Sequence, residues 1–210
     1  TVLQRRVAIK LLPEQVVADT QVRNRFLNEA RAAARLNHPH AVTIYEINSS
    51  GATYYIAMEL ARGGSIQEQL NSQGPLPWPE ATRVAADVCR ALAAAHAAGL
   101  VHRDIKPANI IRSESGLVKL SDFGVARVLG QSAAAAPALG TAAGTPHFMS
   151  PEQCRNDHLD ERSDLYSLGA TYYALLTGRP PYPAAKPIEV MFAHCSQAIP
   201  DPRHVMPDVP

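Results

Sequence analysis

Cysteine and lysine are scarce in this 210-residue sequence, and neither positive nor negative charge is in clear excess. Its three cysteines, Cys89, Cys154 and Cys195, lie far apart and form no C-x-x-C pair. This pattern argues against a disulfide or zinc framework and fits packing roles in a reducing compartment. Twenty basic and nineteen acidic residues leave a net charge of +1. This balance argues against a nucleic-acid partner.

Long apolar runs are also missing. The longest, from Ala91 to Val101, contains His96 and Gly99 and is too short to cross a bilayer, so we expect no membrane contact within this chain. With 46% hydrophobic and 19% charged residues, the composition predicts a folded protein. The length is sufficient for one large domain or for two small lobes.

Local patterns predict a β-rich first part and a helical second part. Strands are expected over Thr1–Leu12, Val42–Ile47 and Thr53–Leu60, with a helix from Asp19 to Leu36. Further helices are expected over Ser65–Leu70, from Pro79 to Gly99 and over Asp160–Leu176, and a small hairpin over Asn109–Leu120. The Ala-rich stretch Gly130–Gly144 reads as a loop.

Two polar clusters flank that hairpin, His102-Arg103-Asp104-Ile105-Lys106-Pro107-Ala108-Asn109 and Asp122-Phe123-Gly124. They follow Val7-Ala8-Ile9-Lys10 and precede Ser150-Pro151-Glu152, and in this order the motifs resemble those of protein kinases. The sequence from Gly99 to Ile110 is similar to that of the bacterial, eukaryote-like serine/threonine kinases. The resemblance implies an α+β, bilobal fold with a small β-rich lobe and a larger helical lobe.

The resemblance also implies an activity, in which the γ-phosphoryl group of MgATP passes to serine or threonine hydroxyls of protein substrates. Asp104 would be the catalytic base, Lys106 would contact the transferred phosphate, and Asn109 and Asp122 would hold magnesium. Lys10 would hold the ATP phosphates, paired with Glu29. The alternative for Glu29 is a surface pair with Arg25.

By the same resemblance, the adenine ring would lie between Ala8 and Ile111. Met58 would stand at the back of the pocket, and Glu59 to Ala61 would form the hinge that reads the base. Ordinary core packing explains Ala8, Met58 and Ile111 equally well.

Regulatory roles are implied for the segment after Asp122. Phe123, followed by Gly124, would pack under the helix that carries Glu29. Arg103 would grip a phosphate on Thr141, for which an unmodified loop threonine is the alternative, and Thr145 would order the substrate loop.

Two carboxylates would support the larger lobe. Asp164 would hold the backbone of the catalytic loop, and Glu152 ordinarily pairs with an arginine near the end of the domain. His102 reads as a structural core histidine.

The sequence departs from the family at its two ends. No glycine occurs among the nine residues before Lys10, so the Gly-rich loop over the phosphates is missing, and the last helices of the large lobe are missing too. We therefore expect a truncated catalytic domain, with an N-terminal lobe over 1–60 and a C-terminal lobe over 61–210. Such domains are cytoplasmic, often in a membrane-anchored protein, and self-association would permit autophosphorylation of the activation loop.

Two alternatives remain beside an active kinase. The missing loop favours a pseudokinase that acts as a binding scaffold, although Lys10, Asp104, Asn109 and Asp122 are all present. A small-molecule phosphotransferase of related fold is the other, but its relatives typically lack the Phe-Gly and Pro-Glu pairs found here.

Overall fold

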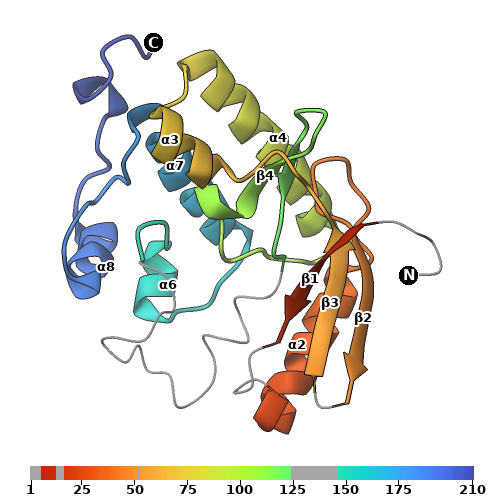
Figure 1. The fold of residues 1–210 in the computed structure, drawn as a ribbon. Helices are drawn as coiled ribbons and strands as arrows, with labels where there is room; N and C mark the ends of the chain where they lie inside the picture. Colours follow the sequence, from red (N-terminus) through yellow and green to blue (C-terminus); the bar gives the residue numbers. More distant parts are fainter. Residues whose placement is uncertain (1–5, 13–16, 52, 124–145) are drawn as a thin grey trace.

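The computed structural model describes residues 6–12, 17–51, 53–123 and 146–210. The small lobe contains an antiparallel sheet of three strands, β1 (Val7–Leu11), β2 (Ile44–Ser50) and β3 (Thr53–Glu59), in the order β1-β3-β2. Strands β2 and β3 form a hairpin, and β1 pairs along the other edge of β3, with Lys10 opposite Ile56 (Figure 1).

Helix α2 (Thr20–Ala33) packs on one face of this sheet. Asp19 caps it, because its carboxylate accepts hydrogen bonds from the backbone N–H groups of Gln21 and Val22. The helix buries Val22, Phe26 and Ala30 in a small core with Leu12 and Ile56. Glu29 therefore lies on the helix just beside the buried stripe.

The large lobe is built around two long helices, α4 (Trp78–Ala97) and α7 (Glu161–Thr177), which pack against each other. Val84, Val88 and Leu92 recur on one face of α4 and are buried, while α7 buries residues on most of its circumference, including Leu175 and Leu176. Shorter helices complete this lobe: α3 (Ile66–Gln73), α6 (Pro151–Arg155), α8 (Pro187–Ser196), and the 3-10 helices η1 (Pro107–Asn109) and η2 (Pro202–His204).

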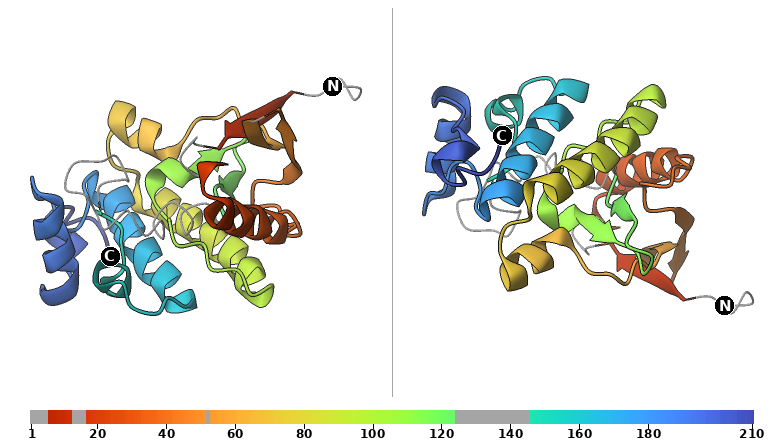
Figure 2. Two further views of the ribbon diagram at one scale, coloured as in Figure 1. Left: turned by 90° about the horizontal axis from the view of Figure 1, so that it is seen from below. Right: turned by 90° about the horizontal axis from the view of Figure 1, so that it is seen from above.

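A two-stranded ribbon, β4 (Ile110–Arg112) paired with β5 (Val118–Leu120), lies where the two lobes meet. Backbone bonds attach it to the small lobe, since the N–H of Val42 donates to the carbonyl of Leu120 at 2.9 Å. Helix α8 lies at the end of the molecule far from the sheet in both views of Figure 2. The catalytic-loop sequence leads directly into this ribbon, so the fold places it between the lobes.

Several element boundaries differ from the expectations. The first helix ends at Ala33 rather than Leu36, because the N–H groups of residues 35 and 36 bond back to the third residue before them and tighten the last turn. Helices α6 and α8 were not expected. The stretch Gly130–Gly144 and the first five residues lie outside the described residues.

Candidate functional site

The catalytic-loop residues meet around the carboxylate of Asp104. The Lys106 ammonium lies 2.7 Å from Asp104 Oδ2, and Asn109 Nδ2 donates to the same oxygen at 2.9 Å and to the Asp104 carbonyl at 2.7 Å. Asn109 is held in η1, at the start of β4, and is 6% exposed, whereas the Asp104 side chain is 35% exposed. The loop therefore presents one accessible carboxylate between a cation and an amide.

Asp164 anchors the backbone of this loop from below. It projects from α7, is fully buried, and accepts the N–H of His102 on Oδ2 at 2.8 Å and the N–H of Arg103 on Oδ1 at 2.7 Å. His96 Nε2, at the end of α4, is 2.7 Å from Oδ2. A buried carboxylate needs such partners, so Asp164 and the loop fix each other.

His102 is a neutral structural residue. Its Nδ1 accepts the N–H of Asp104 at 3.2 Å, so the proton sits on Nε2, which donates to the Ser121 carbonyl at 2.8 Å. Burial lowers the pKa of His102, because the charged ring would lose its hydration. Its ring meets Phe123 edge to face, with centroids 4.7 Å apart.

The backbone is strained at two residues of the site. Arg103 and Asp122 have φ angles of 70° and 66°, in the left-handed region that residues with a Cβ rarely adopt. Neighbouring bonds hold both conformations: Gln153 Nε2 donates to the Arg103 carbonyl at 2.7 Å, and the Ser121 N–H donates to the Asn109 carbonyl at 2.9 Å. In this conformation the Asp122 carboxylate accepts Lys10 Nζ from β1 at 2.7 Å.

The expected ion pair between Lys10 and Glu29 is not formed, although both residues are within the described chain. Lys10 Nζ instead donates to Asp122 Oδ1 at 2.7 Å, and Arg103 reaches Glu29 Oε1 at 3.5 Å. Each carboxylate thus lies beside a different cation, and the forked guanidinium of Arg103 suits a carboxylate partner. The surface pair of Glu29 with Arg25 is not formed either.

The residues expected around adenine come from the small-lobe sheet, from the ribbon of β4 and β5, and from the segment after β3. Ala8 on β1 lies opposite Met58 on β3, and Ile111 on β4 forms a bridge with Ser65, just after the connection that contains Ala61. Glu59 ends β3, and its carboxylate accepts Lys119 Nζ at 3.0 Å.

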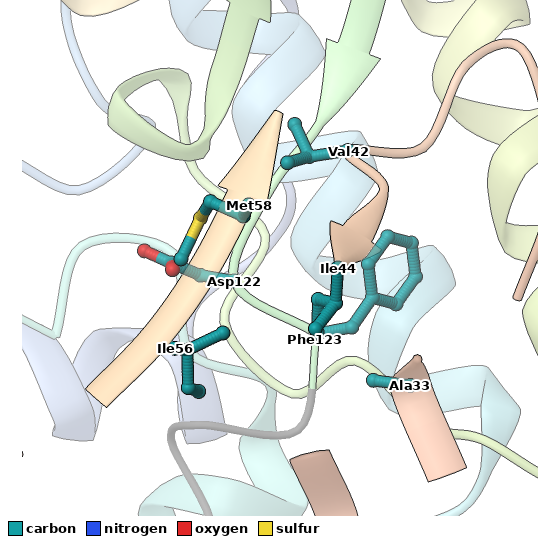
Figure 3. A pocket seen from close by; sticks show the side chains of 7 residues that line it. All are labelled: Ala33, Val42, Ile44, Ile56, Met58, Asp122 and Phe123. Atoms are coloured by element: carbon teal, nitrogen blue, oxygen red, sulfur yellow. The ribbon is translucent and has the colours of Figure 1, made fainter. Parts of the chain in front are cut away.

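A small cavity lies behind Met58. Figure 3 shows the side chains that line it from α2, the residues before β2, β2, β3 and the segment after β5: Ala33, Val42, Ile44, Ile56, Met58, Asp122 and Phe123. Its wall is apolar except for Asp122. Phe123 is 4% exposed and shares the large-lobe core with Ala33, so it packs under the end of α2.

The donor set fits magnesium, with oxygen atoms supplied by Asp122 and Asn109. Asn109 Nδ2 donates to Asp104, so the side-chain oxygen of Asn109, Oδ1, is the atom left for a cation. Among the described residues, no three or more His, Cys, Asp or Glu side chains group into a metal site on their own. In phosphoryl-transfer sites magnesium takes its other ligands from phosphate and water.

Three candidate residues, Gly124, Thr141 and Thr145, lie outside the described residues. Glu152 accepts the Ser163 hydroxyl at 2.7 Å, a neighbour that the sequence did not suggest. Sequence reasoning also missed His96, Gln153 and Lys119. Their contacts join residues between 50 and 78 positions apart, so no local pattern could have revealed them.

Comparison with known proteins identifies the family of this fold and site. The protein kinase domain family matches residues 2–206, and the chain therefore belongs to the protein kinase family. The chain also superimposes on the kinase domain of Mycobacterium tuberculosis PknI, with a TM-score of 0.74 and 28% identity, covering 97% of this chain and 71% of that one. The expected bilobal kinase fold is thus confirmed.

The curated relatives are named as serine/threonine-protein kinases. PknB of Mycobacterium leprae is 40% identical over 196 residues, which cover 91% of this chain and 31% of the relative. PknL of M. tuberculosis is 40% identical over 208 residues, covering 99% and 52%. The chain thus spans about a third of one and about half of the other. No helix within the described residues is both long and apolar enough to span a membrane.

Proposed function

We propose that this chain is the catalytic core of a serine/threonine protein kinase, which transfers the γ-phosphoryl group of MgATP to protein hydroxyls. The observation that carries the proposal is the Asp104 carboxylate, accessible and flanked by Lys106 and Asn109. Phosphoryl transfer asks a protein mainly to position reactants and neutralise charge. Membership of the kinase family and the names of the relatives support the same reaction.

Asp104 orients the substrate hydroxyl and accepts its proton as the hydroxyl oxygen attacks. Lys106, which shares Asp104 Oδ2 in this structure, is placed to neutralise the transferred phosphoryl oxygens. A rigid loop favours transfer because it holds Asp104 in position before the substrate binds. Asp164 supplies that rigidity through the two backbone N–H groups it accepts.

Lys10 and Asp122 form the nucleotide side of the site. Asp122 and Asn109 are the residues that would hold magnesium, which supplies charge neutralisation on the phosphates when bound. Lys10, 2.7 Å from Asp122, is the cation on β1 that faces the same region. Ala8, Met58, Ile111 and the hinge from Glu59 to Ala61 are proposed to receive adenine.

We also propose that phosphorylation in the segment after Phe123 regulates the kinase activity. Phosphorylation of Thr141 would place a phosphate toward Arg103, and Gly124 and Thr145 would shape the segment on either side. Autophosphorylation would require two copies to meet. Glu29 bonds to Arg103 in this structure, so a phosphate on Arg103 would have to share or displace it.

The test is transfer of labelled γ-phosphate from ATP to a mixture of serine-, threonine- and tyrosine-containing peptides, with Asp104→Asn as the control. We expect label on serine or threonine only, and none with the control. Binding of MgATP without transfer to any peptide or to the protein itself would instead establish the scaffold. Transfer to small hydroxylated metabolites alone would establish the small-molecule phosphotransferase.

A further inference from the structure

Two of the three cysteines lie on packed helices of the large lobe, away from the proposed phosphoryl-transfer site. Cys154 lies on α6 and Cys195 on α8, and these two helices pack against each other. The Cys195 thiol donates to the carbonyl of Pro151, the first residue of α6, at 3.7 Å. The Cys195 thiol is also one of the groups that raise the pKa of Cys154, and both side chains are partly exposed. Cys89, in contrast, stands exposed on α4.

We propose that Cys154 and Cys195 are a peroxide-responsive pair that forms a reversible disulfide between α6 and α8. The proposal rests on two cysteines 41 residues apart in the chain that lie on packed helices, with the Cys195 sulfur 3.7 Å from the carbonyl of Pro151 on the helix that carries Cys154. A disulfide requires its two Cβ atoms to lie within about 4.5 Å and to face each other. The contact with Pro151 brings the Cys195 sulfur to the short helix that carries Cys154.

The chemistry needs one oxidant, hydrogen peroxide. The Cys195 thiolate attacks a peroxide oxygen, which gives a sulfenic acid on Cys195 and releases hydroxide. The Cys154 sulfur then attacks the sulfenic sulfur, and its proton leaves with the displaced hydroxyl group as water. In all, two thiols and one peroxide give one disulfide and two waters, with each sulfur losing one electron to the peroxide.

The surroundings assign the order of these steps. Burial, and next the Cys195 thiol, raise the pKa of Cys154 to about 12, so this group stays protonated at neutral pH and reacts poorly with peroxide in solution. Cys195 is therefore the first thiol to be oxidised. Cys154 then reacts within the same molecule, where proximity compensates for its weak acidity.

The position of α6 gives the disulfide a consequence. The residue before Cys154 is Gln153, whose Nε2 donates to the Arg103 carbonyl in the catalytic loop at 2.7 Å and whose Oε1 accepts the Ser150 N–H. Closing two non-bonded sulfurs to a bond of about 2.05 Å draws α6 toward α8. We expect this movement to disturb the loop that carries Asp104, an effect that rests on the proposed kinase function.

The experiment treats the reduced protein and its variants Cys154→Ser, Cys195→Ser and Cys89→Ser with hydrogen peroxide. Intact mass and peptide mapping without reductant are then compared. Wild type and the Cys89→Ser control should lose two hydrogens, give one peptide pair linked through Cys154 and Cys195, and regain both thiols with dithiothreitol. In Cys154→Ser, dimedone should trap a sulfenic acid on Cys195.

Three results would overturn the pair: both thiols surviving peroxide, a linkage through Cys89, or linkage only between molecules. The mass measurement needs no kinase activity, so it stands if the proposed function fails. In the wild-type protein, we expect peroxide to lower peptide phosphorylation and dithiothreitol to restore it. The Cys195→Ser variant should show no loss of phosphorylation with peroxide. A disulfide without any loss would overturn the coupling to the catalytic loop.

Discussion

The loop that carries Asp104 and two of the ion pairs that cross between the lobes, Lys10–Asp122 and Glu29–Arg103, are held in different ways. The loop is fixed through its backbone by Asp164, a fully buried carboxylate from the same lobe. Lys10 and Glu29 belong to the small lobe and contact Asp122 and Arg103 through side chains alone, and the Lys10–Asp122 pair is about one-third exposed. Buried, multiply bonded groups set a geometry, whereas partly exposed ion pairs contribute little and exchange partners readily.

This difference divides the site into a rigid side, fixed by Asp164, and an adaptable side, formed by the ion pairs of Lys10 and Glu29. Asp104, the proposed proton acceptor, is placed on the rigid side, in the loop that Asp164 holds. The cation expected at the phosphates, Lys10, is on the adaptable side and bonds here to Asp122 rather than Glu29. We therefore expect loss of the Asp164 anchor to change both folding and rate, and substitutions on the adaptable side to change rate alone.

The largest effect is expected from Asp104→Asn. Asparagine keeps the shape and can still contact Lys106, but it cannot accept the hydroxyl proton, so the transfer rate should fall by about 10³-fold. Nucleotide affinity should stay near that of wild type, as measured by titration with a fluorescent ATP analogue. A variant with full transfer activity would remove Asp104 from the role of base.

Lys10→Met should lower the transfer rate by about 10²-fold, because one charge-stabilising group is lost. Its free energy of unfolding should change by less than about 1 kcal/mol, since the Lys10–Asp122 pair is partly exposed. Urea denaturation and steady-state kinetics on the same preparation separate these effects. A large loss of stability would place Lys10 on the rigid side instead.

Asp164→Ala tests the rigid side directly. Two backbone N–H groups, of His102 and Arg103, lose their acceptor in a buried place, so the free energy of unfolding should fall by about 2 kcal/mol and the transfer rate with it. Asp157→Ala is the matched control, because Asp157 is exposed and pairs only with Arg155. Equal urea midpoints for the two variants would contradict the anchoring role.

Mild acid should produce the smallest effect. Burial lowers the pKa of His102, His147 and His194 below the ordinary 6.5, so the unfolded chain binds more protons than the folded one as the pH falls through that value. Stability from these neutral rings is present above about pH 6.5 and is lost as the pH falls below it.

Urea midpoints at about pH 7.5 and about pH 5.5 measure this loss. His194→Gln should reduce the difference between them, while His158→Gln, at an exposed position, should leave it unchanged. A midpoint that rises on acidification would reverse the assigned sign.

The local features of the fold were predictable from the sequence, and the contacts between distant residues were not. Asp19, Ser65 and Asp160 cap helices where the spacing of apolar residues indicated a start. Helix α8 was missed because it does not carry a clean apolar stripe: Val190 is buried, but Ile188 and Phe192 are 57% and 67% exposed.

In the site, the motifs supplied the residue types but not their partners. Asp104, Lys106 and Asn109 lie within six residues, so their meeting follows from one short loop. Lys10 has two candidate partners, Glu29 and Asp122, and each is more than 18 residues away in the chain. Which of them it contacts depends on how α2 packs against the large lobe. Sequence patterns carry no information on that packing.

The most direct test of the account is the intact mass of the protein after incubation with MgATP, beside Asp104→Asn and with phosphosites mapped by fragmentation. The account predicts that wild type gains phosphoryl groups on serine or threonine, and that the variant binds the nucleotide but gains none. Equal phosphorylation of both proteins would show that the Asp104 carboxylate does not carry the reaction.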